Sequence, residues 1–320
     1  MALKQVRWGI VSAGNIAGTF ARDIVHATNA RAVAVAARNL ESAEAFAANH
    51  DIDRAYEGYE ALYQDPEVDA IYVATPHTLH LPNSRDALQA GKAVLCEKPL
   101  TTSATECHEL IDIAASSGAY LMEAMWTWFL PAIQRAKRWV DEGRIGELRH
   151  VKAELGYPKA YEPEARLYNP SLAGGCLLDM GIYPIAIARL FIDRAPDSMH
   201  VVAREAPNGV DDDIAMLFDY GSCTASLASS FRCKLPNTAY VVGAKGYIAI
   251  PNGWSARECH LFELDAKVDS FTDDRRGSGF EFQISAVSDD ILNGRRQSGI
   301  VPHAASLAFQ EDMDRVRACF

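Results

Sequence analysis

Apolar runs and helix-spaced apolar positions alternate along the first third of the chain. The apolar runs lie at residues 6–11, 31–38, 69–75, 93–97 and 120–124. Between them, apolar side chains recur at helical spacing, as at Ile16, Phe20 and Ile24. Strands that alternate with helices predict a doubly wound parallel sheet with helices on both faces, an α/β fold.

The pattern changes after Ala124. Two stretches, about 128–143 and 175–192, have helical character and flank a strand-like run at 148–156. Further strand-like runs follow at 200–206, 213–220, 223–231, 238–250 and 258–265, and the last 40 residues look helical. This order predicts an α+β second domain built on an antiparallel sheet. We therefore expect one domain at 1–124 and a second at 125–320.

Composition and charge narrow the class of protein. The 320 residues are 49% hydrophobic, which is enough for a sizeable core, and the net charge is −11. An acidic chain is unsuited to nucleic acid or to anionic membranes, so neither partner is expected. No stretch approaches the roughly 20 apolar residues that span a bilayer. Seven scattered cysteines without a CxxC pair indicate reduced thiols in a cytoplasmic protein and no metal site.

Residues 12–17, Ser-Ala-Gly-Asn-Ile-Ala, join the first predicted strand to the first predicted helix. In that context a G-x-G-x-x-G/A sequence binds a dinucleotide pyrophosphate at the helix N-terminus. Ser12 occupies the first glycine position, whereas Gly14 and Ala17 fit the second and third. The fingerprint is imperfect, so an ordinary tight turn is the alternative. The candidate cofactor contacts in this loop are Ser12, Gly14, Asn15 and Ile16.

The end of the second predicted strand bears on the choice of cofactor. NAD-binding folds usually carry an acid there for the ribose hydroxyls. No acid occurs between Ala30 and Leu40, and Arg38 ends the strand. An arginine at this place accommodates the extra phosphate of NADP. We therefore expect NADP, with NAD possible; the alternative is a solvated Arg38.

Polar residues also follow two later strands. Thr75, Pro76, His77 and His80 come after one, and the buried run 93–96 ends in Glu97 and Lys98. Ligands bind at the carboxyl ends of parallel strands, which makes all six candidates for cofactor contact. For His80 a structural role weighs equally, and Lys98 is otherwise a solvated strand-end residue.

Four motifs occur in a characteristic order: SAGNIA, TPHTLH, CEKP and GGCLLDMGIY. With them the whole chain resembles the glucose–fructose oxidoreductase / inositol dehydrogenase / MocA family. RWGIVSAGNI, GKAVLCEKPL, LMEAMWTWFLPA and PNTAYVVGAKG are most similar to its dimeric dihydrodiol dehydrogenase branch, which includes NADP-dependent D-xylose dehydrogenases.

The resemblance implies an N-terminal Rossmann domain and a C-terminal domain with a large open, mostly antiparallel sheet. In the family that sheet often forms the oligomer interface, so a homodimer or higher homo-oligomer is expected. The terminal helix often packs back on the Rossmann domain. Lys98 corresponds to the family's catalytic lysine, and related structures suggest a cis Lys98–Pro99 peptide.

Asp179 and Tyr183 are the other catalytic candidates, and both are also candidates for substrate binding. They are four residues apart, which places them on one face of a helix. Most of the family has histidine where this chain has Tyr183, whereas the dihydrodiol dehydrogenase branch has tyrosine. Tyr183 would act as general base, with its usual pKa of about 10 lowered by Lys98. Asp179 would orient substrate hydroxyls or Lys98. Proton transfer by Lys98 itself is the alternative.

Aromatic residues are candidates for the substrate wall. Trp126 and Phe129 follow the strand predicted at 120–124, and Tyr157 lies on a predicted loop. Core packing is the competing interpretation for at least two of the three aromatics at 126, 128 and 129. Asp211, Asp212 and Asp213 are predicted to form a turn, because their spacing does not fit a calcium loop.

The resemblance favours an NADP-dependent dehydrogenase that acts on a CH–OH group of a pyranose sugar or a trans-dihydrodiol. The alternatives are a dehydrogenase for another polyol, an enzyme that retains its cofactor and a non-catalytic dinucleotide-binding regulator. The sequence does not choose between sugar and diol.

Overall fold

The computed structural model describes residues 4–320, and internal contacts divide the chain into two compact units. Unit 1 contains the chain up to Trp126 together with Arg275–Leu307, and unit 2 contains Thr127–Asp274 and Ala308–Phe320. The expected boundary placed all of 125–320 in the second domain. The structure instead groups residues 275–307 with the first unit.

Unit 1 is built on a six-stranded, fully parallel sheet in the order β3-β2-β1-β4-β5-β6. Its strands are β1 (Val6–Val11), β2 (Ala30–Ala37), β3 (Arg54–Glu57), β4 (Ala70–Val73), β5 (Ala93–Glu97) and β6 (Leu121–Ala124). The strand order reverses between β1 and β4, which is where open α/β sheets bind their ligands. The predicted fold class of this unit is confirmed.

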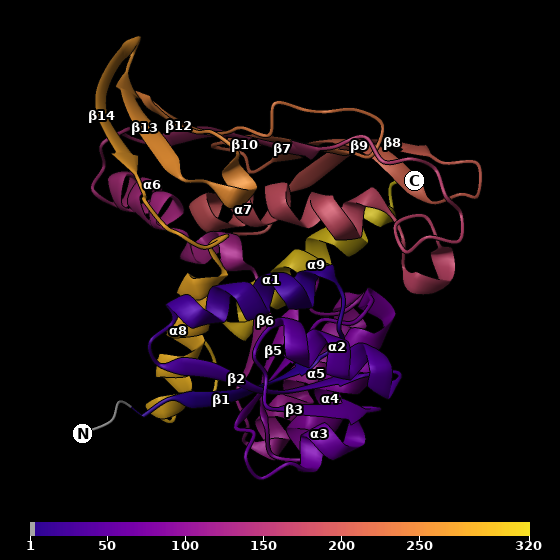
Figure 1. Cartoon of the computed structure of the whole chain (residues 1–320). Helices are drawn as coiled ribbons and strands as arrows, with labels where there is room; N and C mark the ends of the chain where they lie inside the picture. The colour runs from indigo at the N-terminus through magenta and orange to yellow at the C-terminus, as the bar shows by residue number, and fades with distance from the viewer. Residues whose placement is uncertain (1–3) are drawn as a thin grey trace. The chain divides into compact units, whose positions relative to one another are not determined.

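Helices cover both faces of this sheet (Figure 1). They are α1 (Asn15–Asp23), α2 (Leu40–Asn49), α3 (Glu60–Gln64), α4 (His80–Gln89), α5 (Ala104–Ser117) and α8 (Phe280–Leu292), with short 3₁₀ turns η1 (Ile24–His26), η2 (His77–Leu79) and η3 (Trp126–Phe129). The buried core of the sheet consists mainly of its own Val, Ile, Ala and Leu side chains.

Helix α8 belongs to unit 1 because buried polar contacts attach it there. The Asp23 carboxylate at the end of α1 accepts hydrogen bonds from the N–H groups of Ser278, Gly279 and Phe280, at 2.8–3.0 Å. These are N–H groups at the start of α8, which have no partner within the helix. The Trp8 indole donates to Ser288 Oγ at 3.1 Å. Neither contact has a signal in the local sequence pattern.

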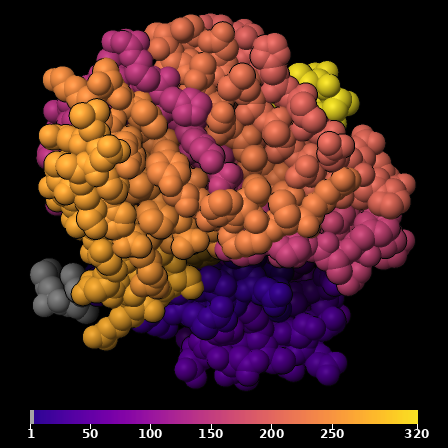
Figure 2. Space-filling model, turned by 90° about the horizontal axis from the view of Figure 1, so that it is seen from above, coloured from indigo at the N-terminus to yellow at the C-terminus, as the bar shows by residue number. Residues whose placement is uncertain are grey.

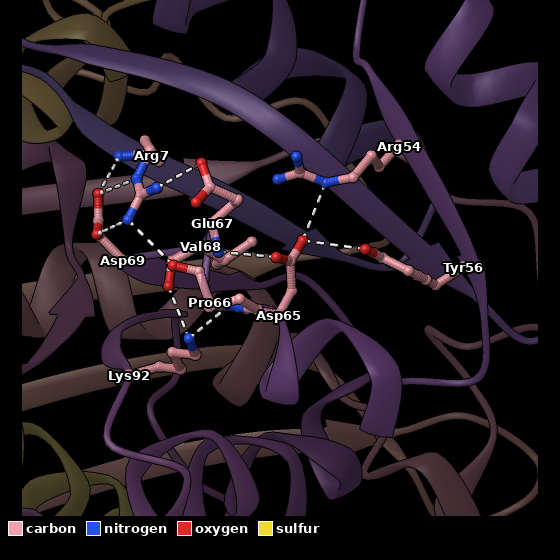
Figure 3. A network of polar contacts seen from close by, with 9 residues as sticks. All are labelled: Arg7, Arg54, Tyr56, Asp65, Pro66, Glu67, Val68, Asp69 and Lys92. Atoms are coloured by element: carbon pink, nitrogen blue, oxygen red, sulfur yellow. Dashed lines mark hydrogen bonds and ion pairs between the residues drawn. The ribbon is translucent and has the colours of Figure 1, made fainter.

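A network of charged groups ties the amino ends of four strands together (Figure 3). Arg7 forms a bidentate pair with Asp69 and a further bond to Glu67 at 2.7 Å. Lys92 donates to the carbonyl oxygens of residues 65 and 68, both at 2.7 Å. Burial raises the pKa of Asp65, but the Glu67 N–H, the Tyr56 hydroxyl and Arg54 more than offset it and hold that pKa below its usual value. This network lies at the sheet edge opposite the carboxyl ends, so it stabilises the fold.

Unit 2 is built on an eight-stranded sheet in the order β14-β13-β12-β11-β7-β10-β9-β8. Only the β7–β10 pair is parallel among the described strand pairs of this sheet. The strands are β7 (Leu148–Gly156), β8 (Ser198–Glu205), β9 (Asp211–Asp219), β10 (Thr224–Ser230), β11 (Ala239–Gly243), β12 (Tyr247–Ile250), β13 (Glu258–Glu263) and β14 (Ala266–Thr272). The prediction of a large, mostly antiparallel sheet is confirmed.

One face of this sheet packs on helices. They are α6 (Pro131–Asp141) and α7 (Ile182–Ile192). Unit 2 also contains the 3₁₀ turns η4 (Pro170–Leu172) and η6 (Gly253–Ser255), the π turn η5 (Leu177–Gly181) and the end of α9 (His303–Arg317), which contacts α7. Buried and less buried residues alternate along β9 and β10, as expected for a sheet with one covered face. The first residues of α9, up to Leu307, are grouped with unit 1, and only its later part, from Ala308, belongs to unit 2.

One helical stretch of unit 2, Pro170–Ile192, is long and apolar enough to cross a membrane by length and composition alone. The sequence analysis expected no apolar segment long enough to span a bilayer, and this stretch is an exception. In the structure 83% of its apolar window is buried, which is the behaviour of a core helix in a folded domain.

Candidate active site

The loop after β1 is shaped by an unusual residue. Ser12 has a φ of +100°, a left-handed conformation that favours glycine, and it occupies the first glycine position of the fingerprint. Its hydroxyl accepts a hydrogen bond from the Gly14 N–H at 3.2 Å. A Cβ added to Gly14 would meet only that hydroxyl, at 3.5 Å, so the loop leaves open space over Gly14.

The N-terminus of α1 has the properties of an anion site. No side chain caps this helix, and its first turn carries no acid. Asn15 and Ile16 are exposed there, so the first N–H groups of the helix face an accessible surface. The positive end of the helix dipole and these free N–H groups suit a pyrophosphate. The residues at 12–17 therefore fit a dinucleotide.

The end of β2 presents a basic group. Arg38 is exposed just beyond the strand. The next residue, Asn39, accepts a hydrogen bond from the Ser42 N–H at 2.9 Å and so caps α2. Asn39 is thus committed to the fold, whereas the Arg38 side chain stays at the surface beside the cofactor loop, since Ser12 N–H bonds to the carbonyl oxygen of Ala36.

His80 joins the ends of β4 and β5. Its Nδ1 lies 2.7 Å from the carbonyl oxygen of Pro99, and its Nε2 lies 2.9 Å from that of Thr75. The ring is fully buried. Both ring nitrogens of His80 contact backbone carbonyl oxygens, which fits the structural role that the sequence left open. Thr75 and His77 are also buried, and Pro76 is half-buried between them.

Glu97 and Lys98 end β5 without leaving an isolated charge. The Tyr72 hydroxyl donates to Glu97 Oε1 at 2.5 Å, and the Lys98 N–H donates to Oε2 at 3.2 Å. Glu97 is buried, whereas Lys98 is half-buried and the Lys98–Pro99 peptide is cis, as expected. Lys98 therefore follows directly from a rigid strand end at the carboxyl edge of the sheet, where ligands of such folds bind.

In unit 2 two glycines allow the chain to enter the π turn η5. Gly175 has a φ of +135°, and a Cβ there would collide with Asp211. A Cβ on Gly174 would meet backbone atoms of residues 167 and 169 at 2.8–2.9 Å. Asp211 is close because its Oδ2 accepts the Leu177 N–H at 2.7 Å. The three aspartates at 211–213 therefore begin β9, and the predicted turn is corrected: Asp211 caps η5.

Asp179 and Tyr183 do not lie on one regular helix. Asp179 is in the π turn, where the repeat differs from 3.6 residues, and Tyr183 is in the first turn of α7. The expectation that a spacing of four residues puts them on one face assumed a regular α-helix, which the chain does not form between these two residues. Asp179 Oδ1 accepts a hydrogen bond from Arg166 at 3.0 Å. Tyr183 packs edge-on against Trp254, with ring centroids 5.8 Å apart.

The aromatic candidates fall into two groups. Trp126 and Phe129 are buried, and Trp126 packs against Phe280. Trp128 donates its indole N–H to the carbonyl oxygen of Ala186 at 3.1 Å, so it belongs to the core. Tyr157 is half-buried and contacts the same Trp254 ring as Tyr183, at 6.4 Å. Of the candidate substrate residues in unit 2, Tyr157 and Tyr183 are therefore brought together.

Sequence reasoning missed three residues of these clusters: Arg166, Asp211 as the acceptor for the Leu177 N–H, and Trp254. Trp254 lies in a turn after β12, where no pattern signals a function. Its carbonyl oxygen accepts a hydrogen bond from Thr127 at 2.6 Å. Between residues 4 and 320 no three His, Cys, Asp or Glu side chains are grouped so that they could hold a metal.

Sequence models of two domains match the chain. One, described as "Oxidoreductase family, NAD-binding Rossmann fold", matches residues 6–125. The other, the GFO/IDH/MocA C-terminal domain, matches residues 133–249. Together they cover most of both units.

Curated relatives and solved structures agree with these matches. The chain is 37% identical to mouse (Mus musculus) trans-1,2-dihydrobenzene-1,2-diol dehydrogenase, over 98% of this chain and 96% of the relative. An aldose–aldose oxidoreductase from Caulobacter crescentus has the same fold, with a TM-score of 0.90 at 24% identity and coverage of 99% and 97%. A 3-ketoreductase from Actinomadura kijaniata, solved with NADP and TDP-benzene, has a TM-score of 0.86 at 27% identity, with 98% of each chain covered. Variants of that 3-ketoreductase with a lysine or a tyrosine replaced have also been solved.

Proposed function

The chain belongs to the GFO/IDH/MocA oxidoreductase family, and we propose from this that it is an NADP-dependent dehydrogenase acting on a CH–OH group of a trans-dihydrodiol or a pyranose sugar. The family membership makes it an oxidoreductase with an NAD-binding Rossmann domain. The single observation that carries the proposed dehydrogenase activity on a CH–OH group is the 37% identity to a dihydrodiol dehydrogenase over 98% of the chain. The retained lysine and tyrosine favour an enzyme over a non-catalytic regulator.

Three parts of unit 1 would hold the cofactor. The uncapped start of α1 and the open space over Gly14 would bind the pyrophosphate. Arg38 would bind the phosphate that distinguishes NADP from NAD, because an exposed guanidinium ends β2 and no acid stands between residues 30 and 40. The rigid β5 end would place Lys98. The bound nicotinamide supplies the hydride acceptor.

The proton of the substrate hydroxyl needs a base. Tyr183 is the proposed base, and Lys98 is the cation that would favour the tyrosinate and stabilise negative charge on the substrate oxygen. The variants of the 3-ketoreductase concern the same two residue types, with nearly the same spacing along the chain, which supports the pairing. Asp179, held by Arg166, would orient a second substrate hydroxyl.

The test is a panel of substrates with both cofactors. Reduction of NADP and of NAD is followed by absorbance with a trans-dihydrodiol, D-xylose, D-glucose and other pyranoses. We expect turnover with NADP. We expect Arg38→Ala to raise the KM for NADP about 10- to 100-fold, since it removes charge-assisted hydrogen bonds to a phosphate, and to leave the KM for NAD nearly unchanged.

Arg31→Ala is the matched control, because Arg31 is exposed at the amino end of the same strand. It should change neither KM. If Arg38→Ala raises the KM for NADP and the KM for NAD by the same factor, Arg38 does not select NADP over NAD. NADP binding without turnover of any substrate would favour the regulator, or a polyol outside the panel.

We also propose that the chain forms a homodimer through the large sheet. The face of this sheet away from α6 and α7 carries no helix among the described residues, and Figure 2 shows β7 crossing it as a magenta strip between orange strands. Val202 and Leu217 are 63% and 43% exposed on it. A shallow groove of about 880 Å³ lies over β7, β8, β9 and β10. Further along the same sheet, on β12 and β13, the Tyr247 and Phe262 rings stack with their centroids 4.6 Å apart. An apolar face of this extent favours burial against a second copy.

Sedimentation velocity at graded protein concentrations measures this association. We expect a dimer for the wild type and dissociation when Val202 and Leu217 are both changed to Asp, because two carboxylates would be buried in the interface. Val268→Asp, at a position 42% exposed on β14, is the control. A wild-type protein that sediments as a monomer at all concentrations contradicts the proposal.

A further inference from the structure

Glu123 is a buried acid on β6, beside the strand that ends in Lys98. In the sheet register Glu123 lies opposite Cys96, and the next residue, Ala124, lies opposite Glu97. The Glu123 side chain is 1% exposed. The proposed reaction gives it no role, and a buried carboxyl is costly unless its partners compensate.

The partners of Glu123 lie in the segment that carries Lys98. Its Oε1 accepts the Leu100 N–H at 2.8 Å. Just before Leu100, the carbonyl oxygen of Pro99 is held by His80 at 2.7 Å. Two buried side chains from different elements thus fix successive backbone groups that follow Lys98. Glu97 fixes the Lys98 N–H on the other side.

The Glu123 carboxyl changes its protonation state near neutral pH. Its pKa is raised to about 7: burial is the largest cause and the Glu97 carboxylate adds to it, whereas the Ser306 hydroxyl, the Leu100 N–H and Lys98 favour the charged form and partly offset the rise. His303, on the same helix as Ser306, bonds to the carbonyl oxygen of Leu121, and burial lowers its pKa, so it is neutral at pH 7. Lys98 is therefore the cation whose charge favours the Glu123 carboxylate.

The other buried acid near β6 belongs to a separate cluster. Asp290 on α8 accepts the Tyr120 hydroxyl at 3.1 Å and pairs with Arg295 at 2.7 Å. Within residues 4–320, the polar contacts of Asp290 include neither Lys98 nor the segment after it. Asp290 is consequently a matched control, because it is a buried carboxyl of the same unit whose partners, Tyr120 and Arg295, lie outside the Lys98 segment.

We propose that Glu123 is a positioning residue for Lys98, whose carboxylate holds the chain through Leu100 and keeps the Lys98 ammonium charged. The proposal rests on the proposed catalytic role of Lys98. The sign of the pH effect follows from the charge. Above about pH 7 Glu123 is a carboxylate and favours the Lys98 ammonium. Below about pH 7 Glu123 is neutral, but an ordinary lysine is charged there without help, so the effect on Lys98 shows on the alkaline side.

The first experiment needs no catalytic activity. The rate at which an amine-reactive acylating reagent labels Lys98 is measured against pH by mass spectrometry. Glu123→Gln keeps an oxygen acceptor for Leu100 and removes the charge. We expect it to lower the apparent pKa of Lys98 by about half a unit or more, because an opposite charge favours the ammonium. Asp290→Asn should leave the Lys98 profile unchanged. An unchanged profile in Glu123→Gln overturns the proposal.

The second experiment follows kcat against pH in the wild type and two variants. We expect wild-type activity to fall on the alkaline side as Lys98 loses its proton, and Glu123→Gln to move this fall to lower pH by about half a unit or more. Asp290→Asn should leave the fall at the wild-type pH. A fall at the same pH in Glu123→Gln and in the wild type contradicts the assignment.

The two experiments separate the failures. If the wild type reduces no cofactor with any substrate, the proposed function fails, and the Lys98 labelling still decides whether Glu123 sets the charge of Lys98. If turnover is normal and the labelling profiles coincide, only the role of Glu123 fails. Circular dichroism of each variant checks that it folds.

Discussion

Replacement of Lys98 by methionine should lower kcat/KM about 10²- to 10⁴-fold while NADP binding changes little. Methionine keeps most of the apolar stem and removes the ammonium, which is proposed to stabilise negative charge on the substrate oxygen and to favour the Tyr183 base. Electrostatic and acid–base contributions of this kind each have this order of magnitude. Steady-state kinetics with NADP gives kcat/KM, and quenching of tryptophan fluorescence gives cofactor affinity.

Lys267→Met is the control, because Lys267 is exposed on β14 in unit 2. It should have the kinetics of the wild type. The comparison with Tyr183→Phe assigns the proton transfer. If Tyr183→Phe retains nearly normal turnover while Lys98→Met is inactive, Lys98 transfers the proton itself. Near-normal activity in Lys98→Met would show that Lys98 has no role in the chemical step.

The sequence predicted the framework of unit 1 because its strands are buried on both faces. Runs such as 93–96 are continuously apolar, and the helices between them have apolar positions at helical spacing. The short strands were harder to predict: β3 (Arg54–Glu57) is polar and half-buried, and β14 (Ala266–Thr272) is largely exposed. An edge strand buries little surface and therefore leaves a weak hydrophobic pattern.

The attachment of α8 to unit 1 was not predictable from periodicity. It depends on Asp23, which is 255 residues from the Ser278 N–H that it binds. Long-range hydrogen bonds of this kind leave no local pattern, so the domain boundary drawn from the change after Ala124 missed them. The same holds for Asp211, whose bond to Leu177 spans 34 positions.

The motifs located the candidate site more reliably than they assigned its contacts. Lys98 and the loop at 12–17 lie at the carboxyl ends of β5 and β1, where the motifs predicted them. His80, in contrast, is committed to two carbonyl groups, and Asp179 pairs with Arg166. A motif gives the residue type and its place on the sheet, whereas hydrogen-bond partners depend on side chains from elsewhere in the fold.

A buried ion pair fixes the helix that carries Tyr183. Arg189, near the end of α7, forms a bidentate pair with Asp312 of α9, at 2.5 and 2.7 Å, and Asp312 is 1% exposed. Removing one partner leaves the other charge buried and unpaired. We therefore expect Asp312→Ala to lower the free energy of unfolding by about 3–5 kcal/mol. Urea unfolding, followed by circular dichroism and tryptophan fluorescence, measures this loss.

Two further variants distinguish an unpaired charge from lost packing. Arg189→Met combined with Asp312→Leu removes both charges and keeps apolar volume, so its stability should lie within about 1 kcal/mol of the wild type or above it. Arg315 lies 4.0 Å from the same carboxylate but is 41% exposed, so Arg315→Ala should cost less than about 1 kcal/mol. A double variant as unstable as Asp312→Ala would show that packing between α7 and α9, and not the unpaired charge, determines the loss. The position of Tyr183 would then depend on the shape of this helix contact and not on its charge.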